Sequence, residues 1–190
     1  MKRKNGSRSS VVGKYHKIHI YTGDGKGKTT AALGLALRAI GADKKVAIIQ
    51  FMKKGNFSEH KTIEKYKLPI LIESFGIGYY KILGDKKPKR AHQKAAQKAL
   101  ERTKELIAKG EHDIIILDEI NVAIGFGLVD IEEVISIFQS SVVGKRSADI
   151  VLTGRRTHPK LKKIADLVTE MKKIKHYFDN GTKARKGIEY

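Results

Sequence analysis

The sequence of 190 residues contains no cysteine, no tryptophan and only three prolines. Without cysteine the chain can form no disulfide, no thiolate metal site and no cysteine nucleophile, which suits the reducing cytoplasm or a heat-stable protein. No apolar run approaches the roughly 18 residues needed to cross a bilayer, and the basic N-terminus lacks the apolar core of a signal peptide. We therefore expect a cytoplasmic protein with no membrane segment.

Acidic residues are scarce: 20 Asp and Glu stand against 39 Lys and Arg, which gives a formal net charge of +19. Such an excess favours polyanionic partners or substrates, and nucleic acid is one candidate. The alternative is a diffusely basic, solvated surface, because the lysines are spread from Lys2 to Lys186 without the interleaved aromatic residues that stack on bases. Composition alone leaves both interpretations open.

The most informative stretch is YTGDGKGKTT at residues 21–30, which follows an expected strand at 18–21 and precedes an expected helix at 31–40. A glycine-rich turn in this place gathers backbone N–H groups and the positive end of the helix dipole around a phosphate. Lys28 can bind the distal phosphates, and the Thr29 hydroxyl can ligate Mg²⁺. The expected nucleotide-binding residues here are Thr22, Gly23, Asp24, Gly25, Lys26, Gly27, Lys28, Thr29 and Thr30.

The match to the pattern G-x-x-x-x-G-K-[ST] is imperfect, because Thr22 stands where the first glycine belongs. The alternative is a glycine-rich surface turn with solvated lysines. The order of strand, turn, Gly-Lys-Thr and helix favours the phosphate loop.

Apolar runs of strand length alternate with helical stretches along residues 17–190, which we expect to form one domain. We expect residues 1–16 to be a disordered basic arm. Continuous apolar strands separated by helices indicate an α/β fold with a mostly parallel sheet and helices on both faces. The expected strands are 18–21, 45–51, 70–75, 113–118, 148–153 and 167–171, and the expected helices are 31–40, 58–66, one after Pro88, one around 130–138 and one after Pro159.

Ligands of such sheets bind beyond the carboxyl ends of the strands, and one strand ends in Asp118 and Glu119. These carboxylates can hold Mg²⁺ directly or through water. Because adjacent side chains point to opposite faces of a strand, both can serve only if the strand ends between them. The alternative is an acidic pair that caps a helix.

Two arginines and the histidines carry weaker signals. Arg155, after Thr153-Gly154, neutralises phosphate charge or is a surface residue, and Arg38 either reaches the nucleotide or extends into solvent. The seven histidines show no metal-ligand spacing, and no Ser/His/Asp order indicates a hydrolase. The motifs thus predict an Mg²⁺-dependent nucleotide-binding protein without defining its reaction.

Several motifs together resemble the ATP:corrinoid adenosyltransferases of the CobA/BtuR type, from residue 17 to the end of the sequence. That family has the same shortened loop without the first glycine. The motifs are TGDGKGKTTAA at 22–32 with Arg38-Ala39, VAIIQFMK at 46–53, GIGY at 76–79, LDEIN at 117–121, VLTGR at 151–155, ADLVTEM at 165–171 and KGIEY at 186–190.

The resemblance implies a RecA-like P-loop NTPase fold and a particular reaction. In it, the Co(I) of cob(I)alamin or another corrinoid attacks C5′ of the ATP ribose, and triphosphate leaves. It implies Lys28 and Glu119 as catalytic residues, Arg38 and Arg155 as nucleotide contacts, and Mg²⁺ on Thr29 with Asp118 or Glu119. It also implies an electron donor protein that reduces cobalt and a homodimer, and it makes nucleic acid an unexpected partner.

The chain departs from this family after Gly78. Enterobacterial members have a threonine and then a tryptophan beside the corrin, following a Gly-x-Gly-Phe turn, whereas here Tyr79, Tyr80 and Lys81 follow Gly78. We expect Tyr79 to supply the aromatic surface for the corrinoid; the alternative is that both tyrosines pack the loop onto the sheet. The rival functions are a nucleic-acid-dependent P-loop ATPase and a small-molecule kinase.

Overall fold

The computed structural model describes residues 17–81, 84–140 and 148–190. Within them, six strands form one sheet in the order β3-β2-β4-β5-β1-β6, and every neighbouring pair is parallel. The predicted parallel α/β sheet is confirmed, whereas the disorder expected for residues 1–16 lies outside the described residues. The strands are β1 (Ile18–Thr22), β2 (Val46–Gln50), β3 (Ile70–Ser74), β4 (Ile114–Asp118), β5 (Asp149–Thr153) and β6 (Leu167–Glu170).

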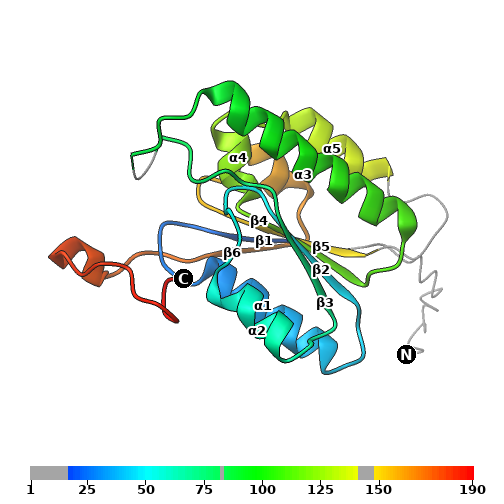
Figure 1. The fold of residues 1–190 in the computed structure, drawn as a ribbon. Coiled ribbons are helices and arrows are strands. Elements are labelled where there is room, and N and C mark those ends of the chain that lie inside the picture. Colours follow the sequence, from blue (N-terminus) through cyan, green and yellow to red (C-terminus); the bar gives the residue numbers. More distant parts are fainter. Residues whose placement is uncertain (1–16, 82–83, 141–147) are drawn as a thin grey trace, which may run out of the picture.

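Helices cover both faces of the sheet: α1 and α2 lie on one face, and α3, α4 and α5 lie on the other (Figure 1). No helix of the described ranges is both long and apolar enough to cross a membrane. The helices are α1 (Lys28–Ile40), α2 (Ser58–Lys65), α3 (Lys89–Lys109), α4 (Ile120–Gly125), α5 (Ile131–Ser140), α6 (Pro159–Ile164) and the short 3₁₀ helix η1 (Tyr177–Asn180).

The strands read as continuous apolar runs because they are covered on both sides. Along β2, Ala47 and Ile49 belong to the larger core cluster, and Val46 and Ile48 belong to a second cluster beneath α1. Small side chains on α1 let this helix pack closely against the sheet, and they are Ala32, Ala36 and Ala39. This packing fixes the start of α1 in front of the end of β1.

Three helices differ from the predictions: α1, α4 and η1, which lies where an irregular tail was expected. α1 begins at Lys28, three residues earlier than expected, because Gly27 adopts a left-handed conformation (φ 115°) immediately before it. The six-residue α4 was not predicted, because it is short and its sequence is apolar apart from Asn121. The earlier start of α1 places Lys28 and Thr29 in its first turn, close to the phosphate loop.

The carboxyl ends of four strands meet at one edge of the sheet, as the sequence predicts. β1 pairs with β5, β5 with β4, and β4 with β2. In register, Thr153 of β5 lies beside Tyr21 of β1, and Asp118 of β4 lies beside Gln50 of β2. Polar side chains from segments far apart in the sequence are therefore brought together there.

Candidate active site

The phosphate loop is a tight turn that packs against the segment after β6. The Gly25 N–H donates to the Met171 carbonyl at 2.7 Å, and the Met171 N–H donates to the Thr22 carbonyl at 2.8 Å. A Cβ atom at Gly23 or Gly25 would lie 2.4 or 2.7 Å from the Met171 carbonyl oxygen, too close for any side chain. These glycines are thus required by backbone packing as well as by the turn, and Gly23 also has a φ of 98°.

Lys28 is buried, and its ammonium group lies inside the curve of this loop. Its Nζ donates to the carbonyls of Gly23 (2.8 Å) and Gly25 (2.7 Å). Burial lowers the pKa of Lys28, although the nearby Glu119 carboxylate opposes the shift. Both partners are backbone carbonyls of the phosphate loop, and the ammonium can exchange them for phosphate oxygens without leaving its place.

Asp118 is the centre of a buried polar network. Its Oδ1 accepts hydrogen bonds from Thr29 Oγ1 and Thr153 Oγ1, both at 2.8 Å. Its Oδ2 lies 3.0 Å from Lys53 Nζ and accepts from Gln50 Nε2 at 3.2 Å. One carboxylate therefore joins the ends of β2, β4 and β5 to the first turn of α1.

Lys53 is held between two carboxylates. Its Nζ lies 3.0 Å from Asp118 and 3.2 Å from Glu59 of α2. Burial acts to lower the pKa of Lys53, but these two carboxylates outweigh burial and raise its pKa overall. Lys53 therefore stays charged and balances the acidic groups of the site.

Glu119 lies just beyond the end of β4 and has a left-handed backbone conformation (φ 64°). The strand thus ends between Asp118 and Glu119, which is the condition for both side chains to reach the same site. As the N-cap residue of α4, Glu119 makes no side-chain capping hydrogen bond, and within the described chain its carboxylate has no hydrogen-bond or ion-pair partner. The capping interpretation of the acidic pair is therefore not supported.

The Glu119 carboxylate sits in a crowded, half-buried place. A Cβ atom at Gly154, whose φ is 125°, would lie 3.2 Å from Glu119 Oε2, so the glycine leaves room for this carboxylate. Burial and then the neighbouring Asp118 charge raise the pKa of Glu119 to about 7, against the opposing effect of Lys53, Lys28 and Arg155. A carboxylate with this pKa gains by contact with a cation.

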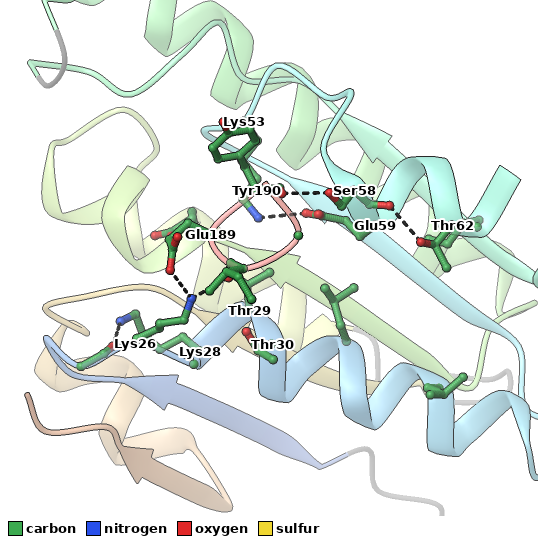
Figure 2. A pocket seen from close by; sticks show the side chains of 18 of the residues that line it. Lys26, Lys28, Thr29, Thr30, Lys53, Ser58, Glu59, Thr62, Glu189 and Tyr190 are labelled. Atoms are coloured by element: carbon green, nitrogen blue, oxygen red, sulfur yellow. Dashed lines mark hydrogen bonds and ion pairs between the residues drawn. The ribbon is translucent and has the colours of Figure 1, made fainter. Parts of the chain in front are cut away.

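A cavity of about 610 Å³ opens over these groups (Figure 2). One side is polar and contains the phosphate loop from Asp24 to Thr30, with Glu119 and Arg155. Another side is apolar and contains side chains of α1, of α2 and of the start of β3. A charged region next to an apolar region suits a ligand with phosphates at one end and a ring system at the other.

The structure does not bring every predicted residue into this cavity. Arg155 lines it, with Nη1 3.5 Å from Asp24 Oδ1, but remains more than half exposed. Thr22 is buried at the end of β1, and it and Gly23 support the loop from behind. Arg38 lies exposed in the last turn of α1, outside the described residues that line the cavity, so the structure gives no support for it as a nucleotide contact.

Comparisons with known proteins agree with this geometry. The sequence model of the family described as ATP:corrinoid adenosyltransferase BtuR/CobO/CobP matches residues 14–190. The chain belongs to this family. It is 37% identical over 176 residues to a corrinoid adenosyltransferase of Sinorhizobium sp, covering 91% of this chain and 79% of the relative.

Two enterobacterial relatives match over a similar extent. Corrinoid adenosyltransferase CobA of Salmonella typhimurium is 33% identical and the corrinoid adenosyltransferase of Escherichia coli K12 is 31% identical, each over 175 residues, or 91% of this chain and 85% of the relative. The crystal structure of flagellar accessory protein FlaH from Methanocaldococcus jannaschii shares the fold alone, with a TM-score of 0.54 and 14% identity over 82% of this chain and 70% of that one.

In this adenosyltransferase-family chain, the two tyrosines after Gly78 have different environments. Tyr80 is buried in the core, where its ring contacts His92 (5.1 Å between centroids) and Phe126 (5.4 Å, edge-on). Tyr79 packs partly on the core but also lines the cavity, and burial raises its pKa to about 12. The packing alternative thus applies fully to Tyr80 and only in part to Tyr79.

Further groups of the site come from the end of β2, from α2 and from the tail. Lys53 follows the end of β2, so the rule that ligands bind beyond the carboxyl ends of the strands predicts its place at this edge, together with that of Gln50. Glu59 and the last four residues, 187–190, also line the cavity. They come from a helix and a tail whose approach to the loop depends on tertiary structure, and nothing in their local sequence pattern reveals it.

Proposed function

We propose that this protein transfers the 5′-deoxyadenosyl group of ATP to the Co(I) of a reduced corrinoid and releases triphosphate, in adenosylcobalamin synthesis or salvage. The observation that carries the proposal is the joining of Lys28, Thr29 and Glu119 in one cavity of a chain that belongs to the adenosyltransferase family. The cavity supplies a phosphate region and an adjacent apolar region, which together suit the phosphates and the adenosine of ATP.

The reaction explains which groups the site needs. Co(I) donates an electron pair to C5′, the bond between C5′ and oxygen breaks, and triphosphate leaves with the electron pair of that bond. Because Co(I) is already a strong nucleophile, the reaction needs no general base. The protein must hold C5′ in line with cobalt and stabilise a leaving group of high negative charge.

The phosphate loop and two cationic side chains can stabilise the leaving group. The phosphate loop and the start of α1 line the cavity, and the Lys28 ammonium is already placed inside the loop. Arg155 lines the same cavity from the end of β5 and can contact the triphosphate from the other side. The buried position of Lys28 strengthens its interaction with phosphate, because little water screens it.

Mg²⁺ fits the oxygen groups beside the loop. Within residues 17–81, 84–140 and 148–190, no three His, Cys, Asp or Glu side chains cluster as a metal cage, so the protein ligands must be few. Mg²⁺ commonly binds in this way, through one or two protein oxygens, water and substrate phosphates. When bound, it neutralises charge on the leaving triphosphate.

Glu119 and Thr29 are better placed than Asp118 to hold this ion directly. The Asp118 carboxylate is already occupied by four side-chain partners. It therefore orients the Thr29 hydroxyl and reaches the ion through water. The Glu119 carboxylate faces the cavity and is available. We therefore assign Thr29 and Glu119 to the ion, with Asp118 supporting Thr29.

We propose Tyr79 as the aromatic surface for the corrinoid. A corrin is a broad and largely apolar disc, so the surface that faces it needs aromatic area rather than charge. Tyr79 offers its ring to the cavity, whereas Lys81 is directed to the Tyr80 ring, with Nζ 5.4 Å from the ring centroid. Lys81 therefore does not replace the family tryptophan.

Production of Co(I) requires an electron, and a chain without cysteine cannot supply it through a dithiol, so we propose a separate electron donor protein. We propose a homodimer, supported by the partly exposed Leu167 and Val168 on the edge strand β6. We propose the cytoplasm as the compartment, because ATP is available there and a chain without disulfides suits its reducing conditions.

The function is tested by the phosphate product. With ATP, Mg²⁺ and chemically reduced cobalamin under anaerobic conditions, we expect one triphosphate for each corrinoid consumed, as resolved by anion-exchange chromatography. ADP would instead indicate a kinase, and phosphate release that depends on added DNA or RNA would indicate a nucleic-acid-dependent ATPase.

A further inference from the structure

The C-terminal segment returns to the phosphate loop from a distant position in the sequence. After η1 the chain turns back, and residues 187–190 line the cavity opposite α1 (Figures 1 and 2). No strand or helix holds these four residues: backbone hydrogen bonds close the turn between Arg185 and Tyr190, and side-chain contacts attach this turn to the rest of the chain. The contacts converge on one residue, Glu189.

Glu189 binds three parts of the chain with its two carboxylate oxygens. Oε1 accepts hydrogen bonds from the Tyr177 hydroxyl and from Lys26 Nζ, the latter at 3.0 Å. Oε2 accepts from the Arg185 N–H at 2.6 Å, and the Arg185 guanidinium lies 4.7 Å from the centre of the Tyr177 ring. The hydrogen bond from Tyr177, with the other donors, lowers the pKa of Glu189 to about 2, so the carboxylate is charged at neutral pH.

Lys26 connects this cluster to the phosphate loop. Its Nζ contacts Glu189 and also donates to the Ile188 carbonyl at 2.5 Å. Lys26 lies between Gly25 and Gly27, in the middle of the loop. Its ammonium therefore serves to attach the tail, whereas Lys28 remains the lysine directed into the loop.

The tail is attached at its other end to α2. Ser58, the first residue of α2, donates from its hydroxyl to the main-chain oxygen of Tyr190 at 2.8 Å (Figure 2). The last residues thus cross from the phosphate loop to α2 and form a side of the cavity. Without them, the phosphate region would be open to solvent on that side.

We propose that Glu189 is a positioning residue that fastens residues 187–190 across the cavity, so that they form a wall of the ATP site. The proposal rests on the proposed function, because it takes ATP as the ligand. The wall excludes water from the phosphate region and restricts the loop through Lys26, and both effects favour bound triphosphate. Glu189 itself need not touch the nucleotide.

Substitution of Glu189 by glutamine tests the proposal. Glu189→Gln keeps the size of the side chain but removes the charge that holds Lys26. We expect the dissociation constant for Mg²⁺–ATP, measured by isothermal titration calorimetry without corrinoid, to rise about tenfold, as expected for the loss of a charge-assisted contact that orders the site. The KM for ATP should rise in parallel, while the KM for the corrinoid stays near that of the wild type.

Asp179→Asn is the matched control. Asp179 lies in the same tail and pairs with Lys173 at 2.9 Å, and both residues belong to the described chain but lie outside the cavity lining. The control should bind ATP as the wild type does. If Glu189→Gln also binds ATP as the wild type does, the tail is not a wall of the ATP site and the proposal is overturned.

A second pair of variants tests the proposal from α2 and leaves the contacts of Glu189 within the tail unchanged. Ser58→Ala removes the attachment at α2, and Thr62→Val removes a hydroxyl from the same helix and cavity that bonds to the Ser58 carbonyl instead of the tail. Ser58→Ala should weaken ATP binding more than Thr62→Val does; equal effects would contradict the proposal. Thermal melting shows that each variant is folded at the temperature of the assay.

The outcome also separates this proposal from the proposed function. If the wild type binds ATP and Glu189→Gln binds it weakly, but no triphosphate forms with reduced cobalamin, the result supports the tail as a wall of the ATP site and contradicts the proposed function. If the wild type forms triphosphate and Glu189→Gln has the same ATP affinity and KM, the result supports the proposed function and contradicts the tail as a wall of the ATP site.

Discussion

Thr29 Oγ1 donates a 2.8 Å hydrogen bond to Asp118 Oδ1, although 89 residues separate the two in the sequence. The bond joins the first turn of the helix after the phosphate loop to the end of a central strand. It fixes the rotamer of the residue expected to face Mg²⁺ before any ligand arrives. Pre-orientation of this kind lowers the cost of binding, because fewer side chains must be ordered when ATP enters.

The first prediction concerns the lysine inside the loop. Lys28→Ala should weaken ATP binding by roughly ten- to a hundredfold, because it removes a buried cation that can bond charged phosphate oxygens. Arg38→Ala, on the same helix but exposed and outside the described cavity lining, is the control and should bind ATP normally. Calorimetric titration with ATP measures both; unchanged affinity in Lys28→Ala would rule out the phosphate-loop assignment.

The second prediction separates the two acidic residues. Glu119→Gln should raise the Mg²⁺ concentration needed for half-maximal activity several-fold while the protein stays folded, because a directly placed oxygen ligand loses its charge. Asp118→Asn should lower the melting temperature as well, because it leaves the buried Lys53 ammonium with one carboxylate partner, Glu59, in place of two. A Mg²⁺ titration of Glu119→Gln that coincides with that of the wild type would contradict the assignment of Glu119 to the ion.

The third prediction concerns the stability of the Mg²⁺-free protein as the pH changes. The pKa of Glu119 is about 7 in the folded chain, and the ordinary value for glutamate is 4.5. Between these values the folded state binds more protons than the unfolded state, so the free energy of unfolding falls as the pH rises from about 4.5 to about 7. Glu119→Gln removes this decrease.

Urea denaturation at pH 5 and pH 8 in the presence of a chelator tests the effect. The free energy of unfolding of Glu119→Gln minus that of the wild type should be larger at pH 8 than at pH 5, by at most about 3 kcal/mol. The same difference between the two proteins at both pH values would show that Glu119 ionises normally in the folded chain.

The fourth prediction distinguishes the neighbouring tyrosines. Tyr79→Ala should raise the KM for the corrinoid far more than it weakens ATP binding, because this ring faces the cavity. Tyr80→Ala should mainly lower the melting temperature, because its ring is packed against His92 and Phe126. Lys81→Ala should be comparatively mild.

Steady-state kinetics with each substrate varied in turn, together with thermal melting, separates these effects. If Tyr79→Ala melts at a lower temperature but has wild-type corrinoid kinetics, its ring belongs to the core and the corrinoid binds elsewhere.

The parallel sheet and the centre of the site could be predicted from the sequence because both leave local signals. A glycine-rich turn between an apolar strand and a helix identifies Lys28 and Thr29, and an acidic pair at the end of an apolar strand identifies Asp118 and Glu119. The rule that ligands bind at the carboxyl edge of a parallel sheet then brings these segments together. No contact between distant residues had to be known.

The tail wall and the place of Arg38 show where prediction from sequence ends. Lys26 and Glu189 are 163 residues apart, and no periodic pattern reveals that a charged residue in an irregular tail meets the loop. For Arg38 the helical period was the available signal: Leu37 lines the cavity, and the next residue is turned about 100° around the helix from it. The resemblance to the family gave Arg38 more weight than this geometry supports.

The most direct test of the account follows the C5′ carbon of ATP. ATP labelled at C5′ is incubated with the protein, Mg²⁺ and chemically reduced cobalamin under anaerobic conditions, and the corrinoid is isolated in the dark. We predict that the label is bound to cobalt, is released by light, and is matched by an equal amount of triphosphate. Label that remains in ADP or AMP, with an unmodified corrinoid, would contradict adenosyl transfer.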